Sequence, residues 1–177
     1  MDEMEYPGIR ITLNAYLGKM PVPMKIDVST GDIITPGEVQ YQYKLLLEDR
    51  PIPLWSYNLE TLLAEKLQTV LARGILNTRM RDFYDLYELT SVYKDKINQL
   101  LLKDAFHATC TKRGSLLLLT TGPQIISTLQ QDSHLREMWE SYQQKYSYAN
   151  EISYIDIMQC TQNLYEVVSR MWKGKAA

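Results

Sequence analysis

Residues 51–74 read PIPLWSYNLETLLAEKLQTVLARG, and within this stretch the hydrophobic pattern changes from that of strands to that of helices. Upstream, apolar and polar residues alternate, whereas after Asn58 the apolar residues recur every three or four positions. Asn58 is a favourable N-cap, and Gly74 is typical of a helix end. The sequence therefore predicts the α+β class, with a sheet in residues 1–57 followed by a helical domain in residues 58–177.

The alternating pattern predicts strands over residues 9–15, 22–28, 39–47 and 52–55. The first two form a hairpin, with a turn from Gly18 to Pro23. A sheet of three or four strands would have exposed edges and few covering helices, and a missing N-terminal portion would explain this.

The helical pattern continues to the end of the chain. Leu116–Leu119 fits a helix or a strand equally well. Beyond the helix that starts at Asn58, we expect helices at about 80–94 (capped by Asn77 or Thr78), at 97–111, from Gly122-Pro123, from Ser133, and from Ser153 to about Trp172.

The composition indicates a globular protein without a strong overall charge. The 177 residues carry a net charge of −2, so no field of the whole chain attracts nucleic acid. Only residues 58–122 are net positive, with 9 basic and 7 acidic side chains. The chain has 13 Tyr against 2 Phe. Half-buried structural positions are the favoured interpretation of these tyrosines, and a stacking platform for bases is the alternative.

The two cysteines, Cys110 and Cys160, lie far apart, which fits a reducing compartment rather than a disulfide scaffold. No apolar run has the length of a membrane span, and the start MDEMEYPG lacks the basic, apolar character of a signal peptide. We therefore expect a cytoplasmic protein without a membrane partner. His107 and Cys110 lack a second ligand pair, so a zinc site is not expected.

Asp27 lies in the predicted strand Lys25–Val28, on the face opposite Ile26 and Val28. Asp is unfavourable in strands. One interpretation is that this face is solvated. The other is a carboxylate held rigidly on a sheet, which suits Mg²⁺.

Lys66 falls on the centre line of the apolar stripe, between Leu62, Leu63 and Val70. Burying an ammonium group is costly. The lysine either extends along its stem to water or points into a cleft and meets an anion there.

Three arginines, Arg73, Arg79 and Arg81, lie within nine residues around Gly74 and a helix start. They form a candidate phosphate cradle, and solvation with pairing to a helix C-terminus is the alternative. Asp82 falls between Leu86 and Leu89 on the helical wheel, and Asp85 lies nearer the polar arc. Both are candidates for a structural ion pair or for holding a cation in an active site.

Four segments in order resemble the AbiEii/AbiGii family, the nucleotidyltransferase toxins of type IV toxin–antitoxin systems that act in abortive infection. The resemblance covers most of residues 5–95. The segments are Tyr6-Pro7-Gly8-Ile9-Arg10, KIDVSTGD (residues 25–32), YNLETLLAEK (57–66) and RMRDFYDLY (79–87).

The resemblance implies a partial polymerase-β-like nucleotidyltransferase sheet followed by a helical domain. It implies transfer of a nucleotide from an NTP to an acceptor with Mg²⁺, with tRNA as the acceptor for some members, and a cognate antitoxin partner. Asp27 matches the third metal carboxylate, Lys66 matches the lysine that meets the triphosphate, and Asp82 and Asp85 match the acidic end of the last motif. Which of these two acts is left open.

The family's Gly-Ser…Asp-x-Asp motif, which supplies the other two metal carboxylates, is absent from the 177 residues. Without these carboxylates we expect transfer to be slowed by many orders of magnitude. We therefore expect a truncated member that is inactive alone or completed by another polypeptide. The alternatives are a non-catalytic remnant that binds nucleotide, RNA or antitoxin, and a structural domain without a ligand.

Overall fold

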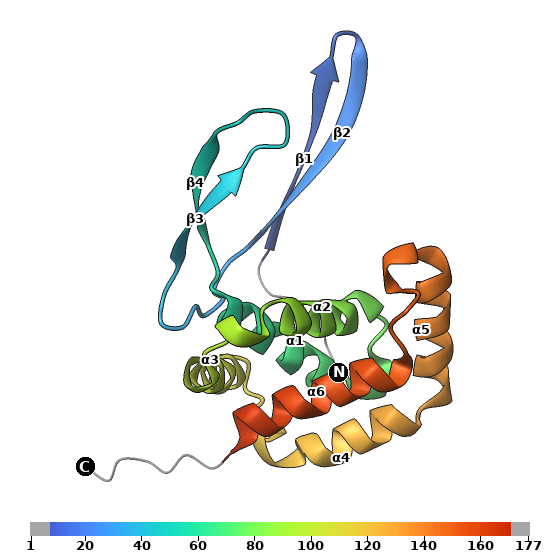
Figure 1. The fold of residues 1–177 in the computed structure, drawn as a ribbon. Helices are drawn as coiled ribbons and strands as arrows, with labels where there is room; N and C mark the ends of the chain where they lie inside the picture. Colours follow the sequence, from blue (N-terminus) through green and yellow to red (C-terminus); the bar gives the residue numbers. More distant parts are fainter. Residues whose placement is uncertain (1–7, 171–177) are drawn as a thin grey trace, which may run out of the picture. The chain divides into compact units, whose positions relative to one another are not determined.

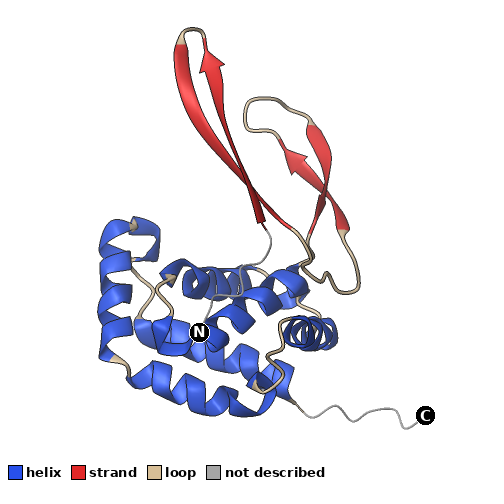
Figure 2. Cartoon of the chain, turned by 180° about the vertical axis from the view of Figure 1, so that it is seen from behind, coloured by secondary structure: helices blue, strands red, loops and turns tan. Residues whose placement is uncertain are grey.

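The computed structural model describes residues 8–170. The described residues contain four strands followed by helices, so the α+β class is confirmed (Figure 2). The strands are β1 (Gly8–Leu17), β2 (Met20–Ser29), β3 (Val39–Lys44) and β4 (Pro51–Ser56). The helices are α1 (Leu59–Arg73), α2 (Met80–Val92), α3 (Gln99–Lys112), α4 (Leu118–Gln131), α5 (Ser133–Lys145) and α6 (Tyr154–Ser169).

The chain divides into two compact units, Met1–Ile33 and Ile34–Ala177. The change from strand to helix falls between Ser56 and Leu59, next to the predicted boundary, but the units divide earlier. Thr35 explains the earlier division. Its carbonyl oxygen accepts a hydrogen bond from Asn58 Nδ2 at 2.5 Å, and its amide donates to Thr61 Oγ1 at 3.1 Å, so this segment is fastened to the start of α1.

The first unit contains the antiparallel β1–β2 hairpin, as predicted. The turn is shorter than the predicted Gly18–Pro23, because Leu17 and Met20 are already paired. Gly18 has a φ of +63°, which a tight turn requires and glycine adopts without strain. Pro21 and Pro23 fit inside β2, since each strand of a two-stranded sheet has an edge that needs no amide donor.

A second antiparallel hairpin pairs β3 with β4, from Val39 opposite Ser56 to Lys44 opposite Pro51. The third strand therefore ends at Lys44 and not at Leu47 as predicted. In the described residues the strands form two separate two-stranded sheets, where one partial sheet was expected.

Helix α1 begins and ends as predicted. The Asn58 side chain accepts a hydrogen bond from Thr61 N, and Gly74 follows the helix with a φ of +53°. The stripe of α1 supplies much of the core, and Leu63, Leu67, Val70 and Leu71 are buried. Around it, α1 packs against α2 and α3, while α6 packs against α2, α3 and α4 (Figure 1).

Several predicted helix ends were wrong. Helix α2 ends at Val92 rather than Lys94, and its N-cap is Arg79, without a capping side chain. Asn98 caps α3, which begins later than Ile97, and Asp132 rather than Ser133 caps α5. In each of these two cases the residue just before the helix has an extended backbone and a side-chain oxygen that accepts from the first turn.

Helix α4 includes Leu118 and Leu119, so Gly122-Pro123 lies inside it and does not begin it. Pro123 has no amide hydrogen to donate to the carbonyl of Leu119, four residues earlier. The hydroxyl of Tyr165 lies 2.8 Å from that carbonyl oxygen and 3.1 Å from that of Leu118. A side chain of α6 thus satisfies the group that the proline leaves unpaired, and the helix continues through it.

Helix α6 begins with the predicted Ser153–Asp156 capping box. It ends at Ser169, while the expected end near Trp172 lies outside the described residues, as do Tyr6 and Pro7 of the first family-like segment.

Candidate functional site

The side chains of Lys66, Asp82 and Asp85 meet between α1 and α2. The Nζ of Lys66 lies 2.6 Å from Oδ2 of Asp85 and 3.3 Å from Oδ1 of Asp82. All three side chains are half-buried, with exposed fractions of 17 to 22%. The structure therefore brings together three of the residues predicted from the sequence, and Lys66 does not extend freely into water.

The local sequence explains this meeting. Lys66 lies on the buried side of α1, whose neighbours Leu63 and Val70 are fully buried. Helix α2 turns its Phe83 and Leu86 into the same core, which places Asp82 and Asp85 along the α1–α2 contact. Two carboxylates beside one ammonium compensate the cost of removing its charge from water.

The predicted arginine cradle divides in two. Arg79 and Arg81 are exposed and line a pocket of about 690 Å³ between the start of α2 and α5. Arg73 is half-buried in the last turn of α1 and does not line this pocket. The Arg81 guanidinium lies 3.8 Å from Asp85, so the pocket adjoins the lysine–carboxylate cluster.

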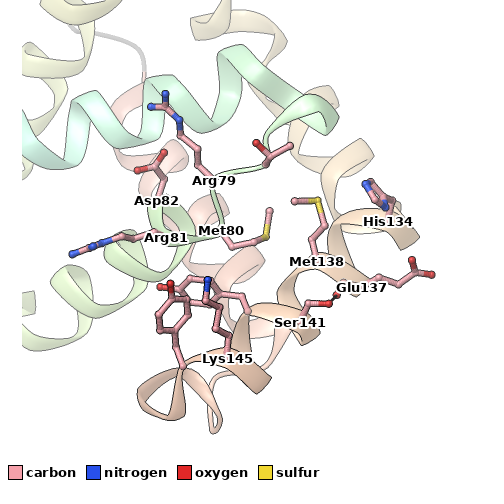
Figure 3. Close-up of a pocket in the computed structure, with 12 residues that line it drawn as sticks. Arg79, Met80, Arg81, Asp82, His134, Glu137, Met138, Ser141 and Lys145 are labelled. Carbon is pink, nitrogen blue, oxygen red and sulfur yellow. Dashed lines mark hydrogen bonds between the residues drawn. The ribbon is translucent and has the colours of Figure 1, made fainter. Parts of the chain in front are cut away.

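Figure 3 shows the two walls of the pocket. The segment Arg79–Asp82 forms one wall, and α5 forms the other. The α5 wall includes His134, Glu137, Met138, Ser141, Tyr142 and Lys145, followed by Tyr146.

Sequence reasoning missed a tyrosine cluster next to this pocket. The rings of Tyr146 and Tyr148 are stacked at 5.4 Å, and Tyr142 and Tyr84 contact them. The Tyr142 and Tyr148 hydroxyls lie 3.0 Å apart. Burial, followed by this hydrogen bond, raises the pKa of Tyr142. The high tyrosine count was the available signal, but the sequence does not show that Tyr84 joins the other three.

A second polar cluster, also missed, joins α1 to the end of α3. Arg113 donates to the Glu65 carboxylate, to Gln68 Oε1 at 2.5 Å and to Thr69 Oγ1 at 3.2 Å. Gln68 Nε2 in turn donates to Ser115 Oγ at 3.1 Å. Glu65 and Arg113 are half-buried, and the polar groups of this cluster form their hydrogen bonds with one another, which indicates a structural role.

Asp27 belongs to the β1–β2 unit and is paired with Arg10 across the hairpin. The guanidinium donates to both carboxylate oxygens, at 2.6 and 3.0 Å, and both side chains are about two-thirds exposed. The hydrogen bond from Arg10 holds the pKa of Asp27 below its ordinary value. Asp27 therefore lies on a strand as predicted, with a cation as its neighbour in the hairpin.

The described carboxylates do not by themselves fit a magnesium site. Within residues 8–170, no three His, Cys, Asp or Glu side chains gather as metal ligands do. Asp27 is engaged by Arg10, and Asp82 and Asp85 are engaged by Lys66.

The two cysteines are free thiols. Burial raises the pKa of Cys110 to about 11 and also raises that of Cys160, so neither has the character of a nucleophile. Among the described helices, none combines the length and apolar character that crossing a membrane requires.

A comparison with models of known protein families gives a match. The family model described as "Nucleotidyl transferase AbiEii toxin, Type IV TA system" matches residues 1–160. No curated protein and no solved structure matches the chain.

Proposed function

Because this chain belongs to the AbiEii nucleotidyltransferase toxin family, we propose that it takes part in transferring a nucleotide from an NTP to an acceptor. In such a transfer an acceptor hydroxyl oxygen attacks the α-phosphorus. A new P–O bond forms between that oxygen and the α-phosphorus. The bond from the α-phosphorus to the oxygen that bridges to the β-phosphorus breaks, pyrophosphate leaves with that oxygen, and the proton of the hydroxyl passes to water. The chemistry demands positive charge along the triphosphate.

The observation that carries this proposal is the half-buried Lys66 beside Asp82 and Asp85. Two carboxylates opposite one ammonium give these three side chains together a net negative charge, so a triphosphate needs further cations beside them. Arg81 lies close enough to Asp85 to compensate part of this net charge. In the proposed complex Lys66 meets the triphosphate, and Asp82 and Asp85 position its ammonium group.

Arg79 and Arg81 are further candidates for binding the triphosphate. Both are exposed at the uncapped start of α2, where backbone amides and the helix dipole favour an anion. We propose that they contact phosphate groups together with Lys66. Arg73 lies away from the pocket, and we assign it only to the end of α1.

The finer parts of the proposal come from the family. Mg²⁺ is the metal the family implies, tRNA is an acceptor of some members, and a cognate antitoxin is the partner expected of a type IV system. The Asp-x-Asp carboxylates that would hold the metal do not occur in the 177 residues. A polypeptide that supplies them is therefore the component to add in an activity assay.

The test measures NTP binding first and transfer second. We expect the full chain to bind NTP by calorimetry, and Lys66→Ala to abolish that binding. The control Lys112→Ala, which changes an exposed lysine at the end of α3, is expected to leave binding unchanged.

Transfer is then followed with NTP labelled at the α-phosphate and total RNA as acceptor. Label on RNA that disappears in Lys66→Ala supports the transferase. Binding without transfer, also after the missing motif is supplied, would favour the binding remnant. Absence of NTP binding would refute the transferase and a remnant that binds nucleotide.

A further inference from the structure

We propose that the pocket between the start of α2 and α5 binds a single-stranded polynucleotide, through its phosphates and through base stacking. This inference deepens the proposed function, on which it rests, by assigning a place to the acceptor strand. It is argued from the cations, the rings and the dimensions of this pocket (Figure 3).

Lys145 on α5 is the cation that we assign to the strand, because Arg79 and Arg81, on the opposite wall, are assigned above to the phosphates of the NTP. Within residues 8–170, neither Arg79 nor Lys145 forms an ion pair with another residue. Arg81 forms a long ion pair of 3.8 Å with Asp85, whose carboxylate is held more closely by Lys66. The lining contains two acidic residues. Asp82 is paired with Lys66, so Glu137 is the acidic residue of the lining whose negative charge opposes a phosphate. Since the whole chain has a net charge of −2, phosphate binding needs a local gathering of cations of this kind.

The rings lie next to these cations. Tyr142 and Tyr146 line the pocket, and Tyr148, with 53% of its surface exposed, is stacked on Tyr146. The Nζ of Lys145 lies 5.3 Å from the centre of the Tyr146 ring. Tyr142 and Tyr146 are half-buried, and Tyr148 beside them is exposed. Cations next to aromatic rings are a usual means of holding single strands, because the rings stack on bases of any sequence.

The pocket also has a suitable size. A volume of about 690 Å³ lies in the range of small-ligand sites and accommodates a nucleotide unit. A duplex presents its bases already stacked on one another, so its bases cannot reach these rings. We therefore expect selectivity for single strands over duplexes.

The chain offers a matched control for the lysine–tyrosine pair. Lys96 lies over the ring of Tyr93 at 5.6 Å, at the end of α2 and outside the pocket lining. This pair has the same chemistry as Lys145 and Tyr146 without the pocket.

The experiment measures fluorescence anisotropy of a labelled 12-nucleotide RNA of mixed sequence with the full chain, at two salt concentrations. We expect Tyr146→Leu to weaken binding by roughly 5- to 150-fold, the range of lost base stacking. Lys145→Ala should weaken it at low salt and reduce the salt slope by about one. Tyr93→Leu and Lys96→Ala should leave binding unchanged. Lys145 is exposed, so this variant serves if Tyr146→Leu does not fold.

Further arms identify the ligand. DNA of the same sequence that binds as well as RNA assigns the pocket to single strands in general, and weaker DNA binding assigns a ribose contact; both support the proposal. Equal loss in the Tyr93 and Lys96 variants, or a duplex that binds as tightly as the single strand, would overturn it. So would an NTP that displaces the strand and depends on Tyr146, since the pocket would then hold the NTP. Strand binding is measured without transfer. Lys66→Ala is expected to abolish NTP binding and to leave strand binding unchanged, so the two proposals can fail separately.

Discussion

The Nζ of Lys66 lies 2.6 Å from Oδ2 of Asp85, although the two residues are 19 positions apart on different helices. The contact joins α1 to α2 and is completed by Asp82, which lies one turn earlier than Asp85 on α2. Removing the partners of a half-buried charge that is paired with two carboxylates, as Lys66 is, costs free energy because the charge is then left without a counter-charge. The contact therefore affects stability as well as the proposed binding of phosphate.

Removing one partner of this contact should destabilise the chain. We expect Asp85→Ala to lower the free energy of unfolding by about 1 to 2 kcal/mol, less than the cost of breaking a fully buried pair because water reaches these groups. Lys66→Met should cost at least as much, since it leaves both Asp82 and Asp85 half-buried without their cation. Urea denaturation measures both, and Arg81→Ala is the control, whose 78% exposed side chain should contribute under about 0.5 kcal/mol. Equal losses for all three variants would contradict this account.

The close approach of Gly122 to Tyr165 should make any larger residue at position 122 unfavourable. A Cβ built on Gly122 would lie 2.1 Å from Cε2 of the Tyr165 ring, so the ring or α4 must move. We expect Gly122→Ala to cost about 1 to 3 kcal/mol by thermal or urea denaturation, despite the better helix propensity of alanine. Gly37→Ala is the control, because a Cβ there meets no atom within 4 Å. A neutral Gly122→Ala would show that α4 and α6 are farther apart.

The hydroxyl of Tyr165 should contribute to the free energy of unfolding independently of the packing of its ring. Tyr165→Phe removes the donor near the Leu119 carbonyl that Pro123 leaves unpaired. We expect a loss of about 1 to 3 kcal/mol in the free energy of unfolding, the cost of an unsatisfied buried polar group. The double variant Tyr165→Phe with Pro123→Ala should recover part of this loss, because alanine restores the backbone donor. No recovery would mean that the hydroxyl does not replace that hydrogen bond.

The Arg113 cluster should be a structural element and not part of the site. We expect Arg113→Met to lower the free energy of unfolding by about 2 to 4 kcal/mol, because Glu65 would remain half-buried without its cation. Arg50→Met, which breaks the exposed pair with Glu48, is expected to change stability by less than about 0.5 kcal/mol. NTP binding by the folded fraction of Arg113→Met should be unchanged, and its loss would assign the cluster to the site.

The pairing of Asp27 with Arg10 should be visible in a titration. The hydrogen bond from Arg10 lowers the pKa of the carboxyl from its ordinary 3.8. A lowered carboxyl pKa stabilises the hairpin above pH 3.8, and this contribution is lost as the pH falls through the lower value of the folded state. We expect Arg10→Ala to move the pKa of Asp27 upward in an NMR titration of its carboxyl carbon. An unchanged pKa would show that the pair does not form in solution.

Local signals in the sequence were sufficient for the elements whose ends depend on neighbouring residues. Asn58 and the Ser153–Asp156 capping box act within one turn, so the starts of α1 and α6 were predicted correctly. Gly122-Pro123 has the local pattern of a helix start, and this prediction was wrong because a tyrosine 42 residues later satisfies the backbone. The N-caps of α2 and α5 and the start of α3 were also predicted incorrectly, because several adjacent residues there are suitable caps. The structure uses Arg79, Asn98 and Asp132.

By itself, the sequence determined the α+β class, the change from strand to helix near Asn58, and the resemblance that the family model confirms. It also singled out Lys66 and Asp82, because a charge on an apolar stripe is visible in the periodicity, whereas Asp85, nearer the polar arc, was singled out by the resemblance. Only the tertiary structure decided that these three meet, that Arg79 and Arg81 but not Arg73 line the pocket, and that Tyr84 joins the tyrosines that follow α5. The physical reason is that periodicity fixes which face of one helix a side chain occupies, whereas a contact between helices depends on how their apolar faces pack together.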